Sequence, residues 1–447
     1  MTWILPENSQ LSFEGLSTPL HVLKGLGSGS QGQVYEVELA GERLALKWYL
    51  PACIARDRQL ESRLAAAIGA TAPSASFLWP IALLRPTAAT QAQLRCREPG
   101  FGYLMGLRPP GFVGAIEHYG GRVDLELRQV LRACLELTDA FHALHSRGLC
   151  YKDISLGNLF LEPSSGRILI CDNDNVDVDG RDLGSVLGTP GFIAPEILMG
   201  RARPGANSDL HSLAVLIFRL LTRHDPFRGA LEREIRCLDE PARRRLYGED
   251  PVFIFDPEDQ RNRPDPELHP APLVTWPIYP RELQALFLQT FGPGLREPGR
   301  RALTGQWQEA LSRTLDRRQL CPSCGQENFP AIGADAPAAP SCWNCGTVLP
   351  PPLELELPCA RVVAATGTTL HRHHLDPLQP PQWDAPFAEV VAHPSDPQLL
   401  GLRNASGSDW EVTLLQGRQI TVAPGMSCNL AALRELHTDG GVIRVRR

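Results

Sequence analysis

Alternating apolar and polar residues characterise the first fifty positions of the chain. The alternation runs through 20–23, 34–39 and 43–48, and a glycine-rich stretch and an Ala40-Gly41-Glu42 turn separate the three segments. A period of two is typical of strands with one buried face, so the pattern predicts a β-meander. Apolar segments at 77–84 and 102–107 are expected to complete a small antiparallel sheet.

The period lengthens after Leu125. Apolar residues then recur at three- and four-residue intervals as far as Leu144, which predicts one long amphipathic helix. Further helices are expected at 57–68, 209–221 and 281–291, whereas the proline- and charge-rich stretch 230–280 predicts an irregular insertion. Beyond Leu353, short alternating runs separated by turn formers favour a compact, sandwich-like all-β domain at 353–447. The fold class expected is α+β.

Length and charge narrow the function classes. A chain of 447 residues is long enough for two or three domains. The formal net charge of -6 gives no overall basic field, so there is no strong nucleic-acid signal. The N-terminus has no basic and apolar signal segment, and the most apolar stretch, 213–221, is far shorter than the ~20 residues of a membrane span. We therefore expect a cytoplasmic protein without a membrane span.

A glycine-rich loop lies between the first two strands of the meander. Residues 27–34 read Gly-Ser-Gly-Ser-Gln-Gly-Gln-Val, the spacing G-x-G-x-x-G-x-V. Glycines let backbone N–H groups approach phosphate oxygens, and because a strand rather than a helix follows, the pattern favours a hairpin lid over a nucleotide. A flexible turn is the alternative. Lys47, on the third strand, lies where a lysine pairs with α- and β-phosphates.

The expected partner of Lys47 is an acidic residue on the following helix. Glu61 is the favoured candidate because the run after it has an apolar face, and Asp57 is the competitor. Two unrelated surface charges are the alternative interpretation.

Two loops after the long helix carry further polar residues. Residues 151–158 read Tyr-Lys-Asp-Ile-Ser-Leu-Gly-Asn, which resembles the catalytic loop His-Arg-Asp-Leu-x-x-x-Asn of protein kinases. Asp172-Asn173-Asp174 follows an apolar strand, where kinases carry Asp-Phe-Gly. The resemblance implies that Asp153 accepts the proton of a substrate hydroxyl and that Asn158 and Asp172 ligate Mg²⁺. A polar turn, and a solvated or Ca²⁺-binding loop, are the alternatives.

Downstream motifs extend this resemblance. Residues 188–196 resemble the end of a kinase activation segment, 207–213 the helix start that anchors the catalytic loop, and Arg301 the arginine that pairs with Glu196. Residues 12–315 thus resemble the eukaryotic-like protein kinase family, in particular a divergent bacterial subgroup with a C-terminal zinc ribbon. The resemblance implies a bilobal domain, with an N-lobe at about 12–106 and a C-lobe at about 107–315.

The function implied is transfer of the γ-phosphoryl group of Mg·ATP to a serine or threonine of a protein substrate. The bacterial subgroup further implies phosphatase or von Willebrand-type partner proteins. The implied ATP-binding residues are Gly27, Ser28, Gly29, Gly32, Val34, Lys47 and Met105, where Met105 would close the adenine pocket or be an ordinary core methionine.

Several positions depart from the family pattern. Tyr151-Lys152 replaces His-Arg, Asn173-Asp174 replaces Phe-Gly, and Ser155 stands where serine/threonine kinases usually carry a lysine. A pseudokinase acting as an ATP-binding signalling scaffold is therefore the alternative function.

Four of the twelve cysteines form two Cys-x-x-Cys-Gly pairs, Cys321 with Cys324 and Cys342 with Cys345. Four thiolates complete a tetrahedral Zn²⁺ site, so we predict a structural zinc ribbon at 316–350, with redox chemistry or disulfides as the alternative. In the last segment His371, His373 and His374 are expected to form a polar surface turn, with a metal or phosphate site as the alternative.

Overall fold

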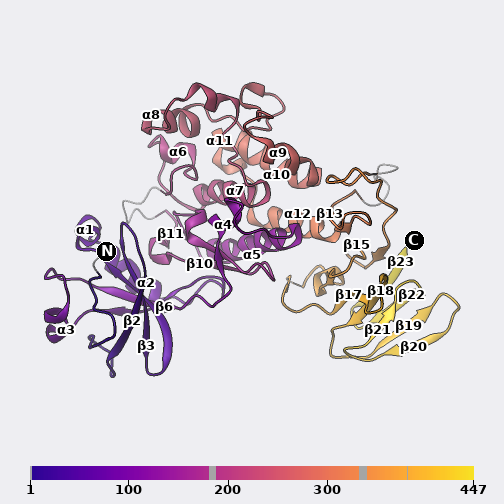
Figure 1. The fold of residues 1–447 in the computed structure, drawn as a ribbon, viewed down its shortest axis with the longest axis horizontal. Helices are drawn as coiled ribbons and strands as arrows, with labels where there is room; N and C mark the ends of the chain where they lie inside the picture. The colour runs from indigo at the N-terminus through magenta and orange to yellow at the C-terminus, as the bar shows by residue number, and fades with distance from the viewer. Residues whose placement is uncertain (1–2, 181–187, 332–339, 380, 447) are drawn as a thin grey trace. The chain divides into compact units, whose positions relative to one another are not determined.

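A computed structural model describes residues 3–180, 188–331, 340–379 and 381–446 (Figure 1). The chain divides into two compact units. The first comprises Met1–Leu125, Gln129–Leu273 and Ala285–Gln308, and the second Glu126–Arg128, Val274–Gln284 and Glu309–Arg447. The predicted zinc-ribbon and β-rich segments fall together in the second unit, so their division into separate domains stays a prediction.

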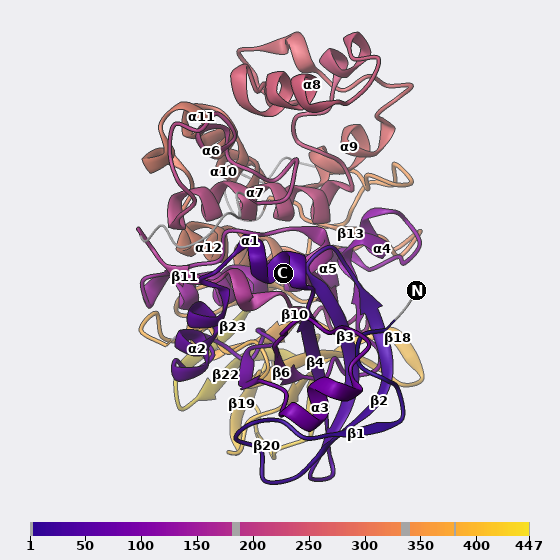
Figure 2. The ribbon, with the colours of Figure 1, turned by 90° about the vertical axis from the view of Figure 1, so that its left-hand side faces the viewer.

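The first unit begins with a six-stranded antiparallel sheet of order β1-β2-β3-β4-β6-β5 (Figure 2). Its strands are β1 (Ser9–Leu11), β2 (Leu20–Ser28), β3 (Gly32–Leu39), β4 (Glu42–Tyr49), β5 (Pro80–Leu84) and β6 (Gly102–Gly106). Helices α1 (Pro51–Arg56), α2 (Leu60–Gly69) and α3 (Ala88–Gln93) accompany the sheet. The predicted meander is confirmed, and β1 shows that the sheet starts before the predicted boundary at residue 12.

Side-chain alternation along β4 directs Lys47 to one face of this sheet. Leu46 and Trp48 belong to a core cluster with residues of β1 and β2. Ala45 and Tyr49 belong to a second cluster that includes Leu60 and Leu64 of α2. Because residues i and i+2 of a strand share a face, Lys47 lies between Ala45 and Tyr49 on the face toward α2.

The remainder of the first unit is mainly helical. The long helix predicted after Leu125 is α5 (Leu127–Ser146), and almost all residues of α7 (Ala206–Thr222) are buried. The other α-helices in this part of the chain are α4 (Ala115–Tyr119), α6 (Pro195–Leu198), α8 (Glu240–Arg244), α9 (Pro270–Thr275), α10 (Arg281–Phe291), α11 (Pro293–Arg296) and α12 (Thr304–Asp316). The short strands are β7 (Val113–Gly114), β8 (Leu149–Cys150), β9 (Leu159–Leu161), β10 (Ile168–Ile170) and β11 (Asp177–Val178).

The stretch 230–280 is less irregular than its composition suggested. It contains α8 and α9, a π-helical turn at Arg245–Glu249, and 3-10 turns at Ala230–Glu234, Gln260–Asn262 and Trp276–Ile278. Both α-helices have a proline in their first turn, where a missing N–H costs no intrahelical hydrogen bond, so a proline-rich stretch still forms short helices. Further 3-10 turns lie at Leu156–Asn158, Asn173–Asn175, Pro298–Arg300 and Arg372–His374.

The second unit ends in two antiparallel sheets, as the alternating pattern predicted. One has the order β15-β14-β23-β22-β19-β20 and the other β16-β17-β18-β21. Their strands are β14 (Glu354–Glu356), β15 (Arg361–Val363), β16 (Thr369–Leu370), β17 (Ala388–His393), β18 (Asp396–Asn404), β19 (Trp410–Leu414), β20 (Gln419–Val422), β21 (Ser427–Asn429), β22 (Leu433–Thr438) and β23 (Gly441–Arg446). Both sheets contribute to one buried cluster, which includes Leu402 and Trp410.

The expectation of a histidine-rich surface turn is wrong for His371 and His374, and His373 between them is half-buried. His371 and His374 are only 2% exposed. His371 Nδ1 lies 2.9 Å from the carbonyl oxygen of Gln382, and His374 Nε2 lies 3.3 Å from Asp316 Oδ1. Local polarity suggested a surface position, but His371 is hydrogen-bonded inside the fold and His374 lies beside a carboxylate there.

No helix in the described ranges combines the length and apolar character needed to cross a membrane.

Candidate active site

Lys47 is the buried centre of a polar cluster in the first unit. It pairs with Val34 across the β3–β4 ladder, and its side chain is 4% exposed. The ammonium group donates to Asp174 Oδ2 at 2.7 Å, to Asp172 Oδ1 at 3.1 Å and to Gln31 Oε1 at 3.1 Å. Strand β4, the glycine loop and the segment after β10 therefore meet at one lysine.

Electrostatics favour the ionised forms of Lys47 and Asp174 in this cluster. Burial alone would lower the pKa of Lys47, but the carboxylate of Asp174, with Tyr103 and Asp172, raises this pKa well above its usual value. Burial raises the pKa of Asp172, Lys47 opposes that rise and Asp174 adds to it. Burial also acts to raise the pKa of Asp174, but Lys47 and Tyr49 outweigh it and leave this pKa lowered. The cluster thus holds one cation between two carboxyl groups.

The glycine loop is a hairpin between β2 and β3, as predicted. A Cβ added at Gly27 or Gly29 would meet no atom within 4 Å, so both glycines border open space. A Cβ at Gly32 would lie 2.5 Å from the carbonyl oxygen of Trp48, so this position needs glycine for the approach of β3 to β4. Ser28 is half-buried in the same hairpin.

Met105 lies on β6, in register with Ala45 of β4. It is 5% exposed and packs in the cluster with Ala45 and Tyr103. Its position beside the lysine strand fits either interpretation of this residue.

Neither helix carboxylate reaches Lys47. Glu61 on α2 instead pairs with Arg85, with Oε1 2.5 Å from Nε. The competitor Asp57 pairs with Arg63 at 2.7 Å. The expected pairing of Lys47 with Glu61 is therefore not formed. Glu61 and Asp57 each pair with an arginine, and Lys47 pairs with aspartates of the loop after β10.

Asp153 and Asn158 lie on one tight loop. The amide Nδ2 of Asn158 donates to the backbone oxygen of Asp153 at 2.9 Å, and Thr189 Oγ1 donates to Asp153 Oδ1 at 2.6 Å. The backbone N–H of Cys171 donates to the carbonyl oxygen of Asn158 at 3.0 Å. This bond joins the loop of Asn158 to the residue before Asp172, so the two predicted Mg²⁺ ligands come from adjoining loops.

Asp172 has a left-handed backbone, with φ 55° and ψ 48°, and a side chain 35% exposed. Asparagine and aspartate tolerate this conformation better than most residues. Carboxylate and amide oxygens are the ligands that Mg²⁺ prefers, so Asp172 and Asn158 are a suitable donor set.

The backbone of the loop that carries Asp153 is anchored by Asp209 of α7. Its carboxylate accepts from the N–H of Tyr151 at 2.7 Å and from the N–H of Lys152 at 2.9 Å, and it lies 3.1 Å from His145 Nε2. Asp209 is 1% exposed, so these bonds are shielded from water. The anchoring implied by residues 207–213 is confirmed.

The residues that replace His-Arg form their own contacts. The Tyr151 hydroxyl donates to the carbonyl oxygen of Cys171, and Lys152 Nζ pairs with Asp177 Oδ2 at 3.0 Å. Both charged side chains of that pair are more than nine-tenths buried. Ser155 is also buried. The residues that depart from the kinase pattern at 151, 152 and 155 are thus buried or bonded to other parts of the fold.

A cavity of about 490 Å³ opens beside Asp153. Its lining includes Gln31, Thr189 and Tyr247, together with the arginines Arg56 and Arg243. The cavity therefore lies between the glycine loop and the segment that carries Thr189.

Glu196 and Arg301 form the pair that the resemblance implied. The guanidinium binds both carboxylate oxygens, at 2.8 and 2.7 Å, and also donates to the carbonyl oxygens of Asn207 and Gly294. The arginine side chain has no exposed surface, so this is a buried bidentate ion pair.

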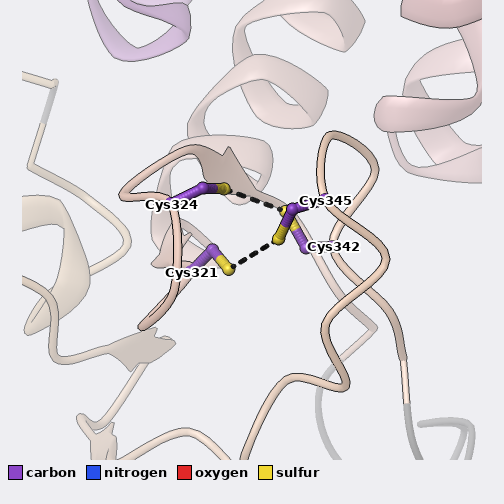
Figure 3. Close-up of side chains that lie close together, drawn as sticks. All are labelled: Cys321, Cys324, Cys342 and Cys345. Carbon is purple, nitrogen blue, oxygen red and sulfur yellow. Dashed lines mark hydrogen bonds between the residues drawn. The ribbon is translucent and has the colours of Figure 1, made fainter.

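The four paired cysteines converge in the second unit (Figure 3). Their sulfur atoms all lie within 4.8 Å of one another, and the Cys321–Cys345 and Cys324–Cys342 distances are both 3.6 Å. The short strands β12 (Gln319–Leu320) and β13 (Glu327–Asn328) flank the first knuckle. The glycine after each pair, Gly325 and Gly346, has a positive φ that closes the knuckle.

Sequence reasoning missed three residues of the Lys47 cluster, Gln31, Tyr49 and Asp174. Tyr49 was accessible to it, because residues two apart on a strand share a face. Asp174 carried a weaker signal, since an acidic residue stands where the kinase pattern has glycine. No spacing rule indicates that its carboxylate turns toward β4.

Comparison with known proteins gives a match over part of the chain. Residues 115–253 match the protein kinase domain family. CBL-interacting protein kinase 4 of Oryza sativa subsp. japonica is 35% identical over 131 residues, which is 25% of this chain and 28% of that protein. Serine/threonine-protein kinase 40 of Homo sapiens is 29% identical over 114 residues, which is 25% of this chain and 26% of that protein.

The chain thus spans only about a quarter of the length of these curated relatives. The matched range includes the catalytic loop, the Asp172 loop and α7. Over residues 115–253 the chain is therefore similar to the protein kinase domain, and its curated relatives include eukaryotic serine/threonine kinases.

Proposed function

We propose that this chain is an ATP-dependent protein kinase that phosphorylates serine or threonine hydroxyls of a protein substrate. The observation that carries the proposal is the meeting of Lys47 with Asp172 on the loop that adjoins Asp153. A phosphate-binding cation, a metal ligand and a proton acceptor are the three groups that phosphoryl transfer requires of the protein.

Each group has a defined task in this proposal. Lys47 binds the α- and β-phosphates under the glycine hairpin, while Asp172 and Asn158 hold Mg²⁺, which neutralises charge on the phosphates when bound. Asp153 orients the acceptor hydroxyl in the adjoining cavity and takes its proton. Thr189 Oγ1 already bonds to Asp153 Oδ1, which shows that a hydroxyl fits beside this carboxylate.

The test is transfer of labelled γ-phosphate from ATP to a protein acceptor in the presence of Mg²⁺. Asp153→Asn is expected to lower the rate at least about a hundredfold while leaving ATP-induced thermal stabilisation intact. ATP binding without transfer in the wild-type protein would instead support the pseudokinase scaffold, for which the missing lysine at Ser155 is the motivating feature. Protein partners of the phosphatase or von Willebrand type stay predictions.

We further propose that Cys321, Cys324, Cys342 and Cys345 hold one structural Zn²⁺. A tetrahedral site with Zn–S bonds of about 2.3 Å places its sulfurs about 3.8 Å apart, close to the 3.6 Å of the two sulfur pairs. The reducing cytoplasm, where we propose that the protein works, keeps such thiols free for metal.

Metal analysis of the purified protein is expected to give one zinc per chain. Replacing Cys321 and Cys324 by serine should remove it, whereas Cys237→Ser, at an exposed cysteine outside the cluster, should not. Zinc-free protein that had never met a chelator would refute the assignment.

A further inference from the structure

The segment after β10 contains a buried carboxylate that the proposed reaction does not use. Asp174 is 2% exposed, and its Oδ2 accepts from Lys47 Nζ at 2.7 Å and from the Tyr49 hydroxyl at 2.5 Å. In kinases the corresponding lysine is held by a glutamate of the helix that follows its strand. Here that helix is α2, and its Glu61 pairs with Arg85.

We propose that Asp174 is the positioning residue for Lys47 and replaces the helix glutamate in setting up the ATP site. The proposal rests on the proposed kinase function and adds to it the residue that orients the phosphate-binding lysine. Asp174 itself does not touch the nucleotide in this arrangement, since it acts through the ammonium group of Lys47.

The turn that carries Asp174 packs against α2, but the hydrogen bonds that hold its backbone do not involve that helix. The neighbouring Asn173 has no exposed surface, and its Nδ2 donates to the carbonyl oxygens of Leu78 at 2.8 Å and Ile170 at 3.1 Å. These bonds tie the loop to residues beside β5 and β10. The Asn-Asp sequence that departs from Phe-Gly thus has a structural purpose, because Asn173 fixes the loop and Asp174 reaches the lysine.

The different roles proposed for Asp172 and Asp174 follow from the exposed fractions of their side chains. The side chain of Asp172 is 35% exposed and that of Asp174 is 1% exposed. A metal ion therefore has access to Asp172, whereas Asp174 remains committed to Lys47. When Asp172 turns to a metal, Lys47 keeps one buried carboxylate, and a hydrogen-bonded buried pair is costly to break.

The consequence is an ATP site whose lysine is held without a carboxylate from α2. In a kinase that uses a helix glutamate, displacement of the helix breaks the lysine pair. In this chain both partners of the pair and the Tyr49 hydroxyl lie on β4 and the loop after β10.

The decisive comparison is Asp174→Asn against Glu61→Gln, two substitutions of carboxylate by amide. ATP affinity is measured by ATP-dependent thermal shift, and KM and kcat by phosphotransfer. Asp174→Asn is expected to raise both the Kd and the KM for ATP about tenfold or more, with a smaller change in kcat. Glu61→Gln is expected to keep the Kd for ATP within about twofold, because its exposed ion pair is remote from the lysine.

Tyr49→Phe serves as the second variant if Asp174→Asn does not fold. It removes only the hydroxyl that orients Asp174, and it is expected to raise the Kd for ATP about threefold. Loss of ATP affinity in Glu61→Gln, or wild-type ATP affinity in a folded Asp174→Asn or in Tyr49→Phe, would overturn the inference. Absence of any ATP-induced shift in the wild-type protein would overturn the kinase proposal, and this inference with it.

Discussion

Removal of Arg301 is expected to destabilise the first unit strongly. Arg301→Ala leaves the Glu196 carboxylate without its counter-charge and deprives the carbonyl oxygens of Gly294 and Asn207 of a donor. Breaking a buried pair by removing one partner costs about 3–5 kcal/mol. Because Glu196 keeps some contact with water, at 15% exposure, we expect a loss of about 4 kcal/mol rather than the sum of all four bonds.

The adjacent residue provides a matched control. Arg300 forms an exposed pair with Glu297, in which both side chains are more than half exposed, so Arg300→Ala should cost less than about 1 kcal/mol. Arg301→Lys keeps the charge but loses the bidentate geometry and should fall between the two. Scanning calorimetry would register the large loss as a fall in melting temperature of about 8–16 °C. Equal melting temperatures for the two alanine variants would refute the reasoning.

Three further predictions concern other buried contacts of the first unit. Asp209→Ala frees two backbone N–H groups of the catalytic loop and is expected to lower kcat at least about tenfold with little change in the KM for ATP, in steady-state phosphotransfer. Burial, reinforced by a nearby arginine, lowers the pKa of His211 well below its usual value. Because the unfolded chain then binds a proton more readily than the folded chain, the free energy of unfolding decreases as the pH is lowered. The wild-type protein is expected to lose about 2 kcal/mol of stability between pH 7 and pH 5 through His211. His211→Phe should not show this part of the loss when urea unfolding is measured at each pH. Gly32→Ala should cost about 1–3 kcal/mol because its Cβ meets the Trp48 carbonyl, whereas Gly27→Ala should be nearly neutral in the same assay.

The outcomes that would contradict these three are specific. An unchanged kcat in Asp209→Ala would mean that the loop keeps its geometry without the anchor. Parallel pH profiles for His211→Phe and the wild type would show that other groups govern acid unfolding. Equal stability of the two glycine variants would contradict the close approach of β3 to β4.

Much of the candidate site could be predicted because its signals are local in sequence. The hairpin around Gly27, the strand carrying Lys47 and the two cysteine knuckles each depend on a few neighbouring residues and on strand or turn geometry. The partner of Lys47 could not be predicted in this way. Whether Lys47 pairs with Glu61 or with Asp174 depends on two features that are distant in sequence. Arg85 pairs with Glu61, and the loop after β10 brings Asp174 to Lys47.

Burial of polar residues was hidden for a similar reason. His371 and His374 belong to a polar run, and polarity alone predicts a surface position. Their contacts with Gln382 and Asp316 form only when separate segments come together. Hydrophobic periodicity therefore located the elements, but the pairing of buried polar groups required the tertiary structure.

The division of the chain into its two units has a consequence for modularity. The second unit includes Glu126–Arg128 and Val274–Gln284 in addition to the C-terminal residues, so α5, α10 and α12 each contribute to both units. Within the second unit the backbone N–H of Arg128 donates to Glu327 Oε2 at 2.8 Å, and Arg317 pairs with Glu282 at 2.8 Å. A chain cut after residue 315 would lose both contacts. We therefore expect that the chain cannot be shortened at this point without loss of stability in the part that remains.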